Sequence, residues 1–381
     1  MKDRREIRGE IDRIDDELAD LFRRRMELAD EVAAAKRADG SPVTDPARER
    51  EIVARVAKRV GPGLAGGARL LYTTLFGISK ARQRLLIRGE SPLAVSIRAA
   101  LEKGAPFPSA AVVACPGTDG SYAQEAVSRM FEIPTILFFN GFESIFDAVE
   151  KGLCPYGILP IENSGAGSVS QVYDLMVKHS FHIVRAIRVK VDHALLGLPG
   201  AKLGDIREVA SHPHALAQCG AFLSELSGCR QVPSSNTAVA AKALAASGRR
   251  DAAVIASRSC AELYGLEVLA EGISDASYNY TRFICISRNL EVTPDAGKLS
   301  LMMSLPHRPG SLNGIISKFS AIGVNLTKLE SRPVPGMDFE FRFVFDFESR
   351  PDDPAVLSLL SELSQDPEIE HFTFLGAYAE R

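Results

Sequence analysis

Apolar and polar positions follow a helical period through the first 90 residues. Apolar side chains recur every three, four or seven residues, which predicts one long amphipathic helix with the stripe Ile7, Ile11, Ile14, Leu18, Leu21, Leu28 and Val32. A helix of about 30 residues is about 45 Å long, too long to bury this stripe within its own domain. We therefore expect it to pack along a partner helix from a second chain. Two shorter helices follow, one opening at an N-cap Asp45 ahead of Pro46 and one spanning about 68–87.

The pattern changes after residues 91–108, where glycine and proline predict a linker with one short helix. From 109 to 288, short apolar runs alternate with helical patterns, beginning with a strand at 110–114 and a helix at 121–131. This alternation predicts an α/β domain with a largely parallel sheet. Ligands of such sheets bind at the carboxyl ends of strands, so polar residues there are candidates for a site.

Residues 298–381 show a third pattern, with strands and helices in the order βαββαβ. The predicted strands cover 299–305, 325–331, 339–347 and 371–375, and the predicted helices cover 311–321 and 354–363. This order is typical of a ferredoxin-like α+β module. The chain is therefore predicted to be multidomain, with an all-α, an α/β and an α+β domain in that order.

Charge and cysteine spacing narrow the class of protein. The formal net charge is −3, which provides no basic field for nucleic acid. No apolar run approaches the roughly 20 residues of a membrane span, and the charged N-terminus lacks the apolar core of a signal peptide, so we expect a cytoplasmic protein without membrane contact. The six cysteines form no Cys-x-x-Cys pair, which predicts reduced buried thiols, no disulfide and no zinc site. We expect no metal and no cofactor.

The three predicted helices carry polar residues that could surround an anion. Arg25 falls in the apolar stripe, and Lys36 lies eleven residues later, almost three turns, on the same face. A cation in a helical core is costly unless an anion meets it. The shorter helices complete a pocket that suits a small dicarboxylate, with Arg48, Glu49, Ser79 and Gln83. The alternative is that these residues form solvated helix faces and that Asp45 is only an N-cap.

This pattern resembles the all-helical chorismate mutase family. The resemblance covers nearly all of residues 1–90 and rests on 7–12, Arg25, Lys36, 45–49, Ser79 and Gln83. It implies that Arg25 and Arg48 hold the substrate carboxylates, while Asp45 and Ser79 line the site. Lys36 and Gln83 would bind the ether oxygen of chorismate, and Glu49 its ring hydroxyl. Arg8 would enter from the partner subunit of an intertwined dimer.

Four polar clusters stand at strand and helix ends in the second segment. They are 120–122 at a helix start, 160–164 before a glycine-rich turn, 211–214 with Gln218 behind it, and 279–283 leading into the last strand. Backbone N–H groups at a helix start can bind an anion, and residues at strand ends can reach a cleft. His212 and His214 lie two residues apart, but without a third ligand they do not indicate a metal site.

Together these clusters resemble prephenate dehydratase over about 112–287. The resemblance implies two α/β subdomains of the periplasmic-binding-protein type with the active site in the cleft between them. Thr281 is the main catalytic candidate, joined by Glu162 and Asn163. Because a Thr hydroxyl is too weak an acid to act unaided, it would relay a proton or hydrogen-bond the leaving oxygen. Arg282 is a candidate carboxylate partner, and the other substrate-binding candidates are Ser121, Ser164, Ser211, His212 and Gln218.

The third segment resembles the ACT domain attached to prephenate dehydratases. The match rests on 308–313, at the first strand–helix junction, and on 329–333, at the end of the second strand. It implies an L-phenylalanine site at an interface between two subunits, formed by Gly310, Ser311, Leu312, Asn313, Glu330, Ser331 and Arg332. The helix start offers N–H groups to a carboxylate. The alternative is a purely structural dimerisation module.

These resemblances predict a bifunctional enzyme of phenylalanine biosynthesis, both an isomerase and a lyase. It would convert chorismate to prephenate and prephenate to phenylpyruvate, under feedback inhibition by L-phenylalanine, as a homodimer or higher homo-oligomer. The nearest alternative is the same architecture acting on arogenate to give phenylalanine directly. Two further alternatives are an amino-acid sensor with degenerate sites and a helical domain that serves only as a dimer clamp.

Overall fold

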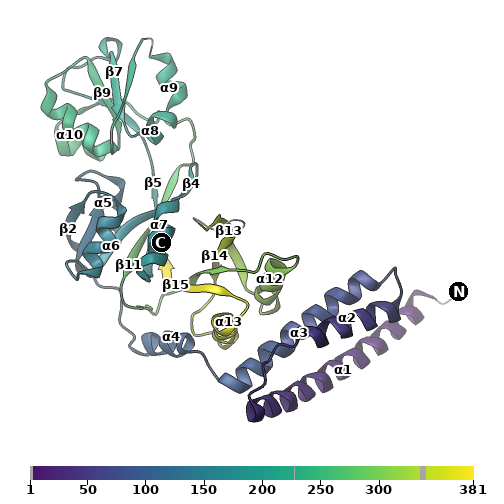
Figure 1. The fold of residues 1–381 in the computed structure, drawn as a ribbon. Helices are drawn as coiled ribbons and strands as arrows, with labels where there is room; N and C mark the ends of the chain where they lie inside the picture. Colours follow the sequence, from purple (N-terminus) through teal and green to yellow (C-terminus); the bar gives the residue numbers. More distant parts are fainter. Residues whose placement is uncertain (1–2, 227, 335–339) are drawn as a thin grey trace. The chain divides into compact units, whose positions relative to one another are not determined.

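The computed structural model describes residues 3–226, 228–334 and 340–381 (Figure 1). The chain divides into two compact units. The first unit contains Met1–Arg98, Met303–Val344 and Asp352–Phe372, and the second contains Ala99–Met302, Phe345–Pro351 and Thr373–Arg381. The predicted third segment, 298–381, therefore contributes to both units.

Three long helices open the first unit: α1 (Arg4–Asp39), α2 (Pro46–Val60) and α3 (Ala65–Arg88). Their ends follow from local sequence. Asp3 and Glu6 form a capping box at the start of α1, and Gly40 ends it in the left-handed conformation. Asp45 caps α2 through the Arg48 N–H. Because α3 packs on both α1 and α2, the three predicted helices are confirmed as one bundle (Figure 1).

Most of the apolar stripe of α1 lies exposed. Leu18 and Leu21 are 54% and 62% exposed, whereas the buried residues of α1 are Met26, Ala29 and Ala33. An exposed apolar face of this length is typical of a protein–protein interface. None of the helices in the described ranges is long and apolar enough to cross a membrane.

The predicted linker contains the helix α4 (Pro92–Glu102). This helix is packed rather than free, since Ala94 and Ile97 are completely buried. Ser91 precedes it and donates a 3.1 Å hydrogen bond to Ser361 within the first unit. The start of the predicted linker is therefore part of a folded unit.

The larger sheet of the second unit contains β1 (Ala110–Pro116), β2 (Ile133–Phe139), β3 (Tyr156–Asn163), β5 (His182–Lys190) and β11 (Tyr280–Ser287). The strands β2 and β3 lie parallel to β1, and β11 runs antiparallel between β3 and β5. A short β4 (Gly167–Ser168) folds back onto β3. The helices packed against these strands are α5 (Tyr122–Met130), α6 (Phe142–Glu150) and α7 (Ser170–His179). The sheet is mixed rather than largely parallel, because β11 enters it from the smaller sheet and not from a helical crossover.

The smaller sheet has the strand order β10-β6-β9-β7-β8. Its strands are β6 (Ala194–Gly197), β7 (Glu208–Ser211), β8 (Arg230–Pro233), β9 (Ala252–Ala256) and β10 (Glu267–Ala270). Alternate residues of β9 enter two separate buried clusters, one with α10 (Thr237–Ser247) and α11 (Ser259–Tyr264), the other with α8 (Pro213–Ala217) and α9 (Gly220–Glu225). The chain passes between the two sheets at 191–193 and again at 271–279.

The third segment has the predicted order βαββαβ, formed by β12 (Lys298–Ser304), α12 (Ser311–Ala321), β13 (Asn325–Pro333), β14 (Phe341–Glu348), α13 (Pro354–Gln365) and β15 (Glu370–Glu380). Phe339, the first residue of the predicted third strand, lies outside the described residues. The last strand is longer than predicted, and its end pairs in parallel with β5, Ala379 opposite Arg185. In the second unit the larger sheet therefore continues from β5 through β15 and β12 to β14.

Candidate active sites

The cations of the helical bundle are held by backbone and ring contacts. Arg25 is half-buried, donates from Nη1 to the Leu75 carbonyl at 3.3 Å and lies 5.6 Å from the centre of the Phe76 ring. Lys36 donates from Nζ to the Val43 carbonyl at 2.7 Å. Carbonyl oxygens do not neutralise a charge, so both cations can still attract an anion.

A buried polar pair lies on one face of α3. Ser79 and Gln83 are 8% and 7% exposed, and Gln83 Nε2 donates to Ser79 Oγ at 3.1 Å. Gln83 Oε1 is buried without a hydrogen-bond partner. A buried polar atom left unpaired costs about 1–3 kcal/mol, which a polar ligand group would recover. Rotation of the amide would present its NH₂ to the same position.

The other four predicted residues of the bundle are either exposed or already engaged by contacts within the chain. Arg48 is exposed and pairs with Glu51 at 2.7 Å, and Asp45 is used as the N-cap of α2. Glu49 pairs with Lys80 at 3.1 Å, a cation that the sequence interpretation did not include. Arg8 lies exposed on α1.

In the second unit, the ends of β3 and β11 join Asn163 to Thr281. The two residues are register partners, and Asn163 Nδ2 donates to Thr281 Oγ1 at 3.0 Å. Asn163 Oδ1 is fixed by the N–H groups of Gly165 and Ala166, at 3.0 and 2.9 Å. The glycine-rich turn therefore determines which end of the Asn163 amide faces Thr281.

A chain of polar side chains extends from this pair to Gln218, which follows α8, and on to Tyr122 of α5. Asn163 Nδ2 also donates to Asn279 Oδ1 at 2.8 Å, and Asn279 Nδ2 donates to Gln218 Oε1 at 3.0 Å. His193 Nε2 lies 3.1 Å from the same Gln218 oxygen, and His193 Nδ1 lies 3.3 Å from the Tyr122 hydroxyl. His193 and Asn279 stand on the two connections between the sheets. Thr281, Asn163 and Gln218, expected at one site, are thus linked through a continuous network.

The environment keeps this network uncharged. Burial lowers the pKa of His193, although its hydrogen bond to Gln218 works in the other direction, so the imidazole is neutral near pH 7. A neutral ring that donates from Nε2 to Gln218 can accept at Nδ1. Burial raises the pKa of Tyr122, whose hydroxyl donates to the Asp192 carbonyl at 2.7 Å. His193 was not predicted from the sequence, and Tyr122 and Asn279 were not selected from the clusters that contain them.

The remaining predicted residues of this segment have mostly structural contacts. Ser121 caps α5 through the Gln124 N–H, Ser211 is completely buried and donates to the Ile255 carbonyl at 2.6 Å, and His212 Nδ1 accepts from the His214 N–H. Ser164 Oγ accepts from the Tyr280 N–H at 3.0 Å, which ties the turn to β11. Glu162 keeps 38% of its side chain exposed at the end of β3.

Arg282 has a different role from the one predicted. Its side chain is 7% exposed and its Nη1 donates to Asp346 at 2.6 Å, while Nη2 donates to the Tyr378 hydroxyl at 2.6 Å. Because successive side chains of a strand point to opposite faces, Arg282 points away from the face of Thr281. The guanidinium is held by groups of the chain itself and not left for a substrate carboxylate.

The predicted phenylalanine-binding residues lie on α12 and β13 of the first unit. Gly310 has a left-handed backbone, φ 90°, before the start of α12, and Ser311 Oγ is buried without a hydrogen-bond partner. Leu312 and Asn313 continue this first turn. Glu330, Ser331 and Arg332 lie near the end of β13, and Glu330 pairs with Lys328 at 3.1 Å.

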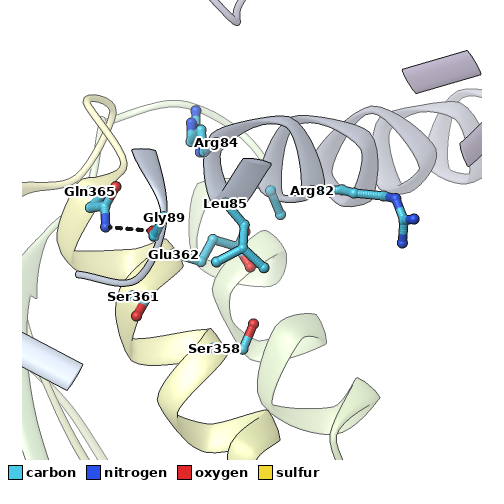
Figure 2. Close-up of a pocket in the computed structure, with 9 residues that line it drawn as sticks. Arg82, Arg84, Leu85, Gly89, Ser358, Ser361, Glu362 and Gln365 are labelled. Atoms are coloured by element: carbon cyan, nitrogen blue, oxygen red, sulfur yellow. Dashed lines mark hydrogen bonds between the residues drawn. The ribbon is translucent and has the colours of Figure 1, made fainter. Parts of the chain in front are cut away.

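A pocket of about 230 Å³ lies between α3 and α13 in the first unit (Figure 2). Gln365 Nε2 donates to the Gly89 carbonyl at one side of it, and Leu85, Ser358 and Ser361 line it. Arg84, adjacent to Gln83, is 5% exposed and pairs with Asp366 at 2.7 Å. The pocket borders this buried ion pair and contains none of the predicted substrate-binding residues.

The six cysteines are free thiols, and five of them are buried as predicted, whereas Cys229 is partly exposed. Burial raises the pKa of Cys115 and of Cys219 to about 12, so both stay protonated and unreactive.

Two family models match the chain. The prephenate dehydratase model matches residues 113–291, and the chorismate mutase type II model matches residues 7–84. An Arabidopsis thaliana protein named arogenate dehydratase/prephenate dehydratase 1, chloroplastic, is 37% identical over 265 residues, which are 65% of this chain and 67% of the relative.

Two solved structures resemble this chain at more than 30% sequence identity. Prephenate dehydratase from Arthrobacter aurescens, in complex with L-Phe, is 31% identical with a TM-score of 0.63, over 70% of this chain and 89% of that one. GqqA, described as a novel type of quorum quenching acylase, is 32% identical with a TM-score of 0.63, over 71% of this chain and 98% of that one.

Proposed function

Because the chain belongs to the prephenate dehydratase family and carries a chorismate mutase type II domain, we propose that it converts chorismate to prephenate and then prephenate to phenylpyruvate. The chain is an isomerase and a carbon–oxygen lyase. The observation that carries the proposal is that both family models match one chain, in segments that contain the Ser79–Gln83 and Asn163–Thr281 pairs. We assign 1–90 to the mutase, 109–288 to the dehydratase and 298–381 to a regulatory domain.

The mutase reaction needs positioning and charge rather than a nucleophile. The rearrangement is unimolecular, so the enzyme selects the compact conformer of chorismate and stabilises negative charge that grows on the ether oxygen. In the proposed site Arg25 and Arg48 hold the two carboxylates. Lys36 and the rotated amide of Gln83 donate to the ether oxygen.

A second copy of the chain would complete the mutase. The exposed stripe of α1 supports this, because Leu18 and Leu21 would otherwise remain in water at roughly 1.5–3 kcal/mol each. Arg8 lies on the same helix as the stripe, so a partner helix packed there would bring its own Arg8 towards the bundle. The proposed enzyme is therefore at least a homodimer.

Arg25→Ala tests the mutase assignment. It should abolish chorismate consumption, while turnover of supplied prephenate stays within about twofold of wild type, since the two sites do not share residues. Arg24→Ala is the matched control, because Arg24 is an exposed neighbour on the same helix. Loss of both activities in a folded Arg25→Ala protein would show that the sites are not separate.

The dehydratase reaction removes two groups from one ring. Prephenate loses carbon dioxide from the ring carbon that carries its carboxylate, and that electron pair completes the aromatic ring as the hydroxyl on the opposite carbon leaves. One proton must reach this hydroxyl, so the products are phenylpyruvate, carbon dioxide and water. Asn163 Nδ2 donates to Thr281 Oγ1, which leaves the Thr281 O–H as a donor to the leaving oxygen. In this proposal Thr281 relays that proton from solvent, since a Thr hydroxyl is too weak an acid to supply it unaided.

Thr281→Ala tests this assignment. It should lower dehydratase kcat by about 100-fold or more, a loss typical of a positioned catalytic hydrogen bond. Thr281→Ser keeps the hydroxyl and should recover most of the rate. Prephenate should accumulate from chorismate in the alanine variant. Wild-type formation of phenylpyruvate by Thr281→Ala would instead move the catalytic role to Glu162.

Arogenate is the second candidate substrate. The relative from Arabidopsis thaliana carries both names, arogenate dehydratase and prephenate dehydratase. The two substrates share the ring that reacts and differ at the side chain, so the Thr281 chemistry applies to both. Competition between them, read as a ratio of kcat/KM, assigns the preference. A ratio above about tenfold for arogenate would reverse our assignment.

Regulation by L-phenylalanine forms the last part of the proposal. A related dehydratase structure contains L-Phe, and this chain has a helix start with a buried, unpartnered Ser311 hydroxyl. We place the carboxylate at the α12 N-terminus, the ring against Leu312 and the ammonium near Glu330. Calorimetry with phenylalanine on the full chain should show binding that Leu312→Ala weakens and Ser320→Ala does not. A protein that binds phenylalanine but turns over neither substrate would be a sensor rather than an enzyme.

A further inference from the structure

Arg282 is a buried charge that the reaction proposed above does not use. It follows Thr281 directly on β11. Its guanidinium meets three groups from strands of the third segment: Asp346 on β14 at 2.6 Å, and Tyr378 and Glu380 on β15 at 2.6 and 3.4 Å. All of these residues belong to the second unit.

The Asp346 carboxylate is itself held in place. It is 2% exposed, and while Oδ2 accepts from Arg282, Oδ1 accepts from the Ser300 hydroxyl at 2.6 Å. The Ser300 and Tyr378 hydroxyls also lie 2.6 Å apart. Two fixed bonds to one carboxylate leave it little freedom, so Asp346 can hold the guanidinium in one position.

The backbone next to Thr281 is irregular, so regular strand pairing alone does not fix the direction of the Thr281 side chain. The pairing of β11 with β3 runs from Thr281 opposite Asn163 and Arg282 opposite Glu162, and then shifts between Arg282 and Phe283. Irregularities of this kind change the direction of nearby side chains and interrupt the ladder. At this point the direction of Thr281 depends on more than regular strand pairing.

We propose that Asp346 is a positioning residue for the dehydratase reaction, which holds Arg282 and thereby fixes the orientation of Thr281 towards the leaving hydroxyl. The proposal rests on the catalytic role of Thr281 argued above. It makes the third segment part of the dehydratase site, although none of its residues needs to touch the substrate.

The charges around Arg282 are consistent with Asp346 holding its guanidinium. Burial raises the pKa of Tyr378, so the phenol stays neutral, and the carboxylates beside Arg282 are Asp346 at 2.6 Å, Glu380 at 3.4 Å and, at the longer distance of 3.9 Å, Glu162. Burial alone would raise the pKa of Glu380, but Arg282 and Lys298 lower it, so this carboxylate is ionised at neutral pH. With Glu380 in place, loss of Asp346 leaves Arg282 charged and paired, but its Nη1 loses the 2.6 Å bond and keeps only the 3.9 Å approach to Glu162.

Asp346→Ala in the full chain is the first measurement, with Glu348→Ala as the matched control, because Glu348 is an exposed carboxylate on the same strand. Asp346→Ala should lower dehydratase kcat by at least about tenfold and change KM by less than about threefold. Asp346→Asn can still accept from Arg282 and should recover most of kcat. Mutase turnover in the same samples should not change. Equal kcat in Asp346→Ala and Glu348→Ala would overturn the proposal.

A double-mutant cycle separates positioning from general damage to the fold. If Asp346 acts through Thr281, then Asp346→Ala should cost less than about twofold in kcat when Thr281 is already alanine. The same loss in both backgrounds would show that Asp346 supports the fold alone. If Thr281→Ala itself retains full turnover, the role of Thr281 fails, and this is seen before Asp346 is changed.

Tyr378→Phe keeps the test available if Asp346→Ala does not fold. It removes one hydrogen bond to Arg282 and retains both carboxylates. A reduced kcat that disappears in the Thr281→Ala background supports the anchor, and an unchanged kcat contradicts it.

Discussion

Asn279 is the residue of the dehydratase network whose removal should be most informative. It is 5% exposed, its amide accepts from Asn163 at 2.8 Å, and it donates to Gln218 at 3.0 Å. Asn279→Ala deletes both bonds but keeps the backbone bond from Val191, because the Asn279 carbonyl remains. The substitution therefore loosens Asn163, and with it Thr281, without removing either residue.

The expected loss of stability and of kcat in Asn279→Ala depends on which hydrogen bonds Asn163 and Gln218 keep. Asn163 still reaches Thr281, and Gln218 still has His193, so neither amide is completely unpaired. Two ordinary hydrogen bonds at about 0.5–1.5 kcal/mol each then give a loss of about 1–3 kcal/mol in stability. The same range applied to the transition state is about 5- to 150-fold in kcat.

Phenylpyruvate formation from prephenate and urea unfolding of the full chain measure the two effects. Asn289→Ala is the control, since Asn289 is exposed on the segment after β11. Mutase activity in the same preparation shows that the first unit remains folded. If Asn279→Ala matches Asn289→Ala in kcat and in stability, the network is not part of the dehydratase site, and the reasoning from its hydrogen bonds is refuted.

Three further predictions concern stability and assembly. Burial lowers the pKa of His193, so the unfolded chain binds the proton first as pH falls. The contribution of His193 to stability is therefore complete above about pH 6.5 and is lost as pH falls towards the folded pKa. Urea unfolding at pH 7 and 5.5 should show a loss of unfolding free energy at the lower pH, and His193→Asn should reduce that loss. Asp366→Ala strands Arg84 in a buried site and should cost about 3–5 kcal/mol, read as a lower thermal midpoint. Leu18→Asp should dissociate the oligomer in sedimentation and abolish mutase activity while prephenate turnover persists.

The helices of the first unit were predictable because their signals are local. Asp45 with Pro46 marks the start of α2, and the apolar period of α1 runs without interruption. The order of elements in the third segment was predictable for the same reason. The pairing of β15 with β5 was not, because it joins residues nearly two hundred positions apart, Glu380 and Ala186, whose local patterns carry no information about register.

The candidate site residues were likewise predictable where a local motif marks them and not where a long-range contact places them. Thr281 and Asn163 were predictable from their motifs, but His193 was not, since it follows β5 on a three-residue connection and meets Gln218 only in the folded chain. The assignment of Arg282 to the substrate followed from its place beside Thr281. A sequence does not show which side of a strand another element will cover, and here β14 and β15 supply the carboxylates that hold Arg282.

The third segment does more than carry the predicted phenylalanine site, because it also holds the residue that follows Gln83 and the residue that follows Thr281. In the first unit Arg84 follows Gln83 and pairs with Asp366, and in the second unit Arg282 follows Thr281 and pairs with Asp346. Each arginine is buried, so each requires its carboxylate. Removing the segment would leave two buried cations without these partners and expose the edge of β5. Regulation should therefore be separated from catalysis by point substitutions such as Ser331→Ala rather than by truncation, since a truncated chain would lose activity for reasons unrelated to phenylalanine.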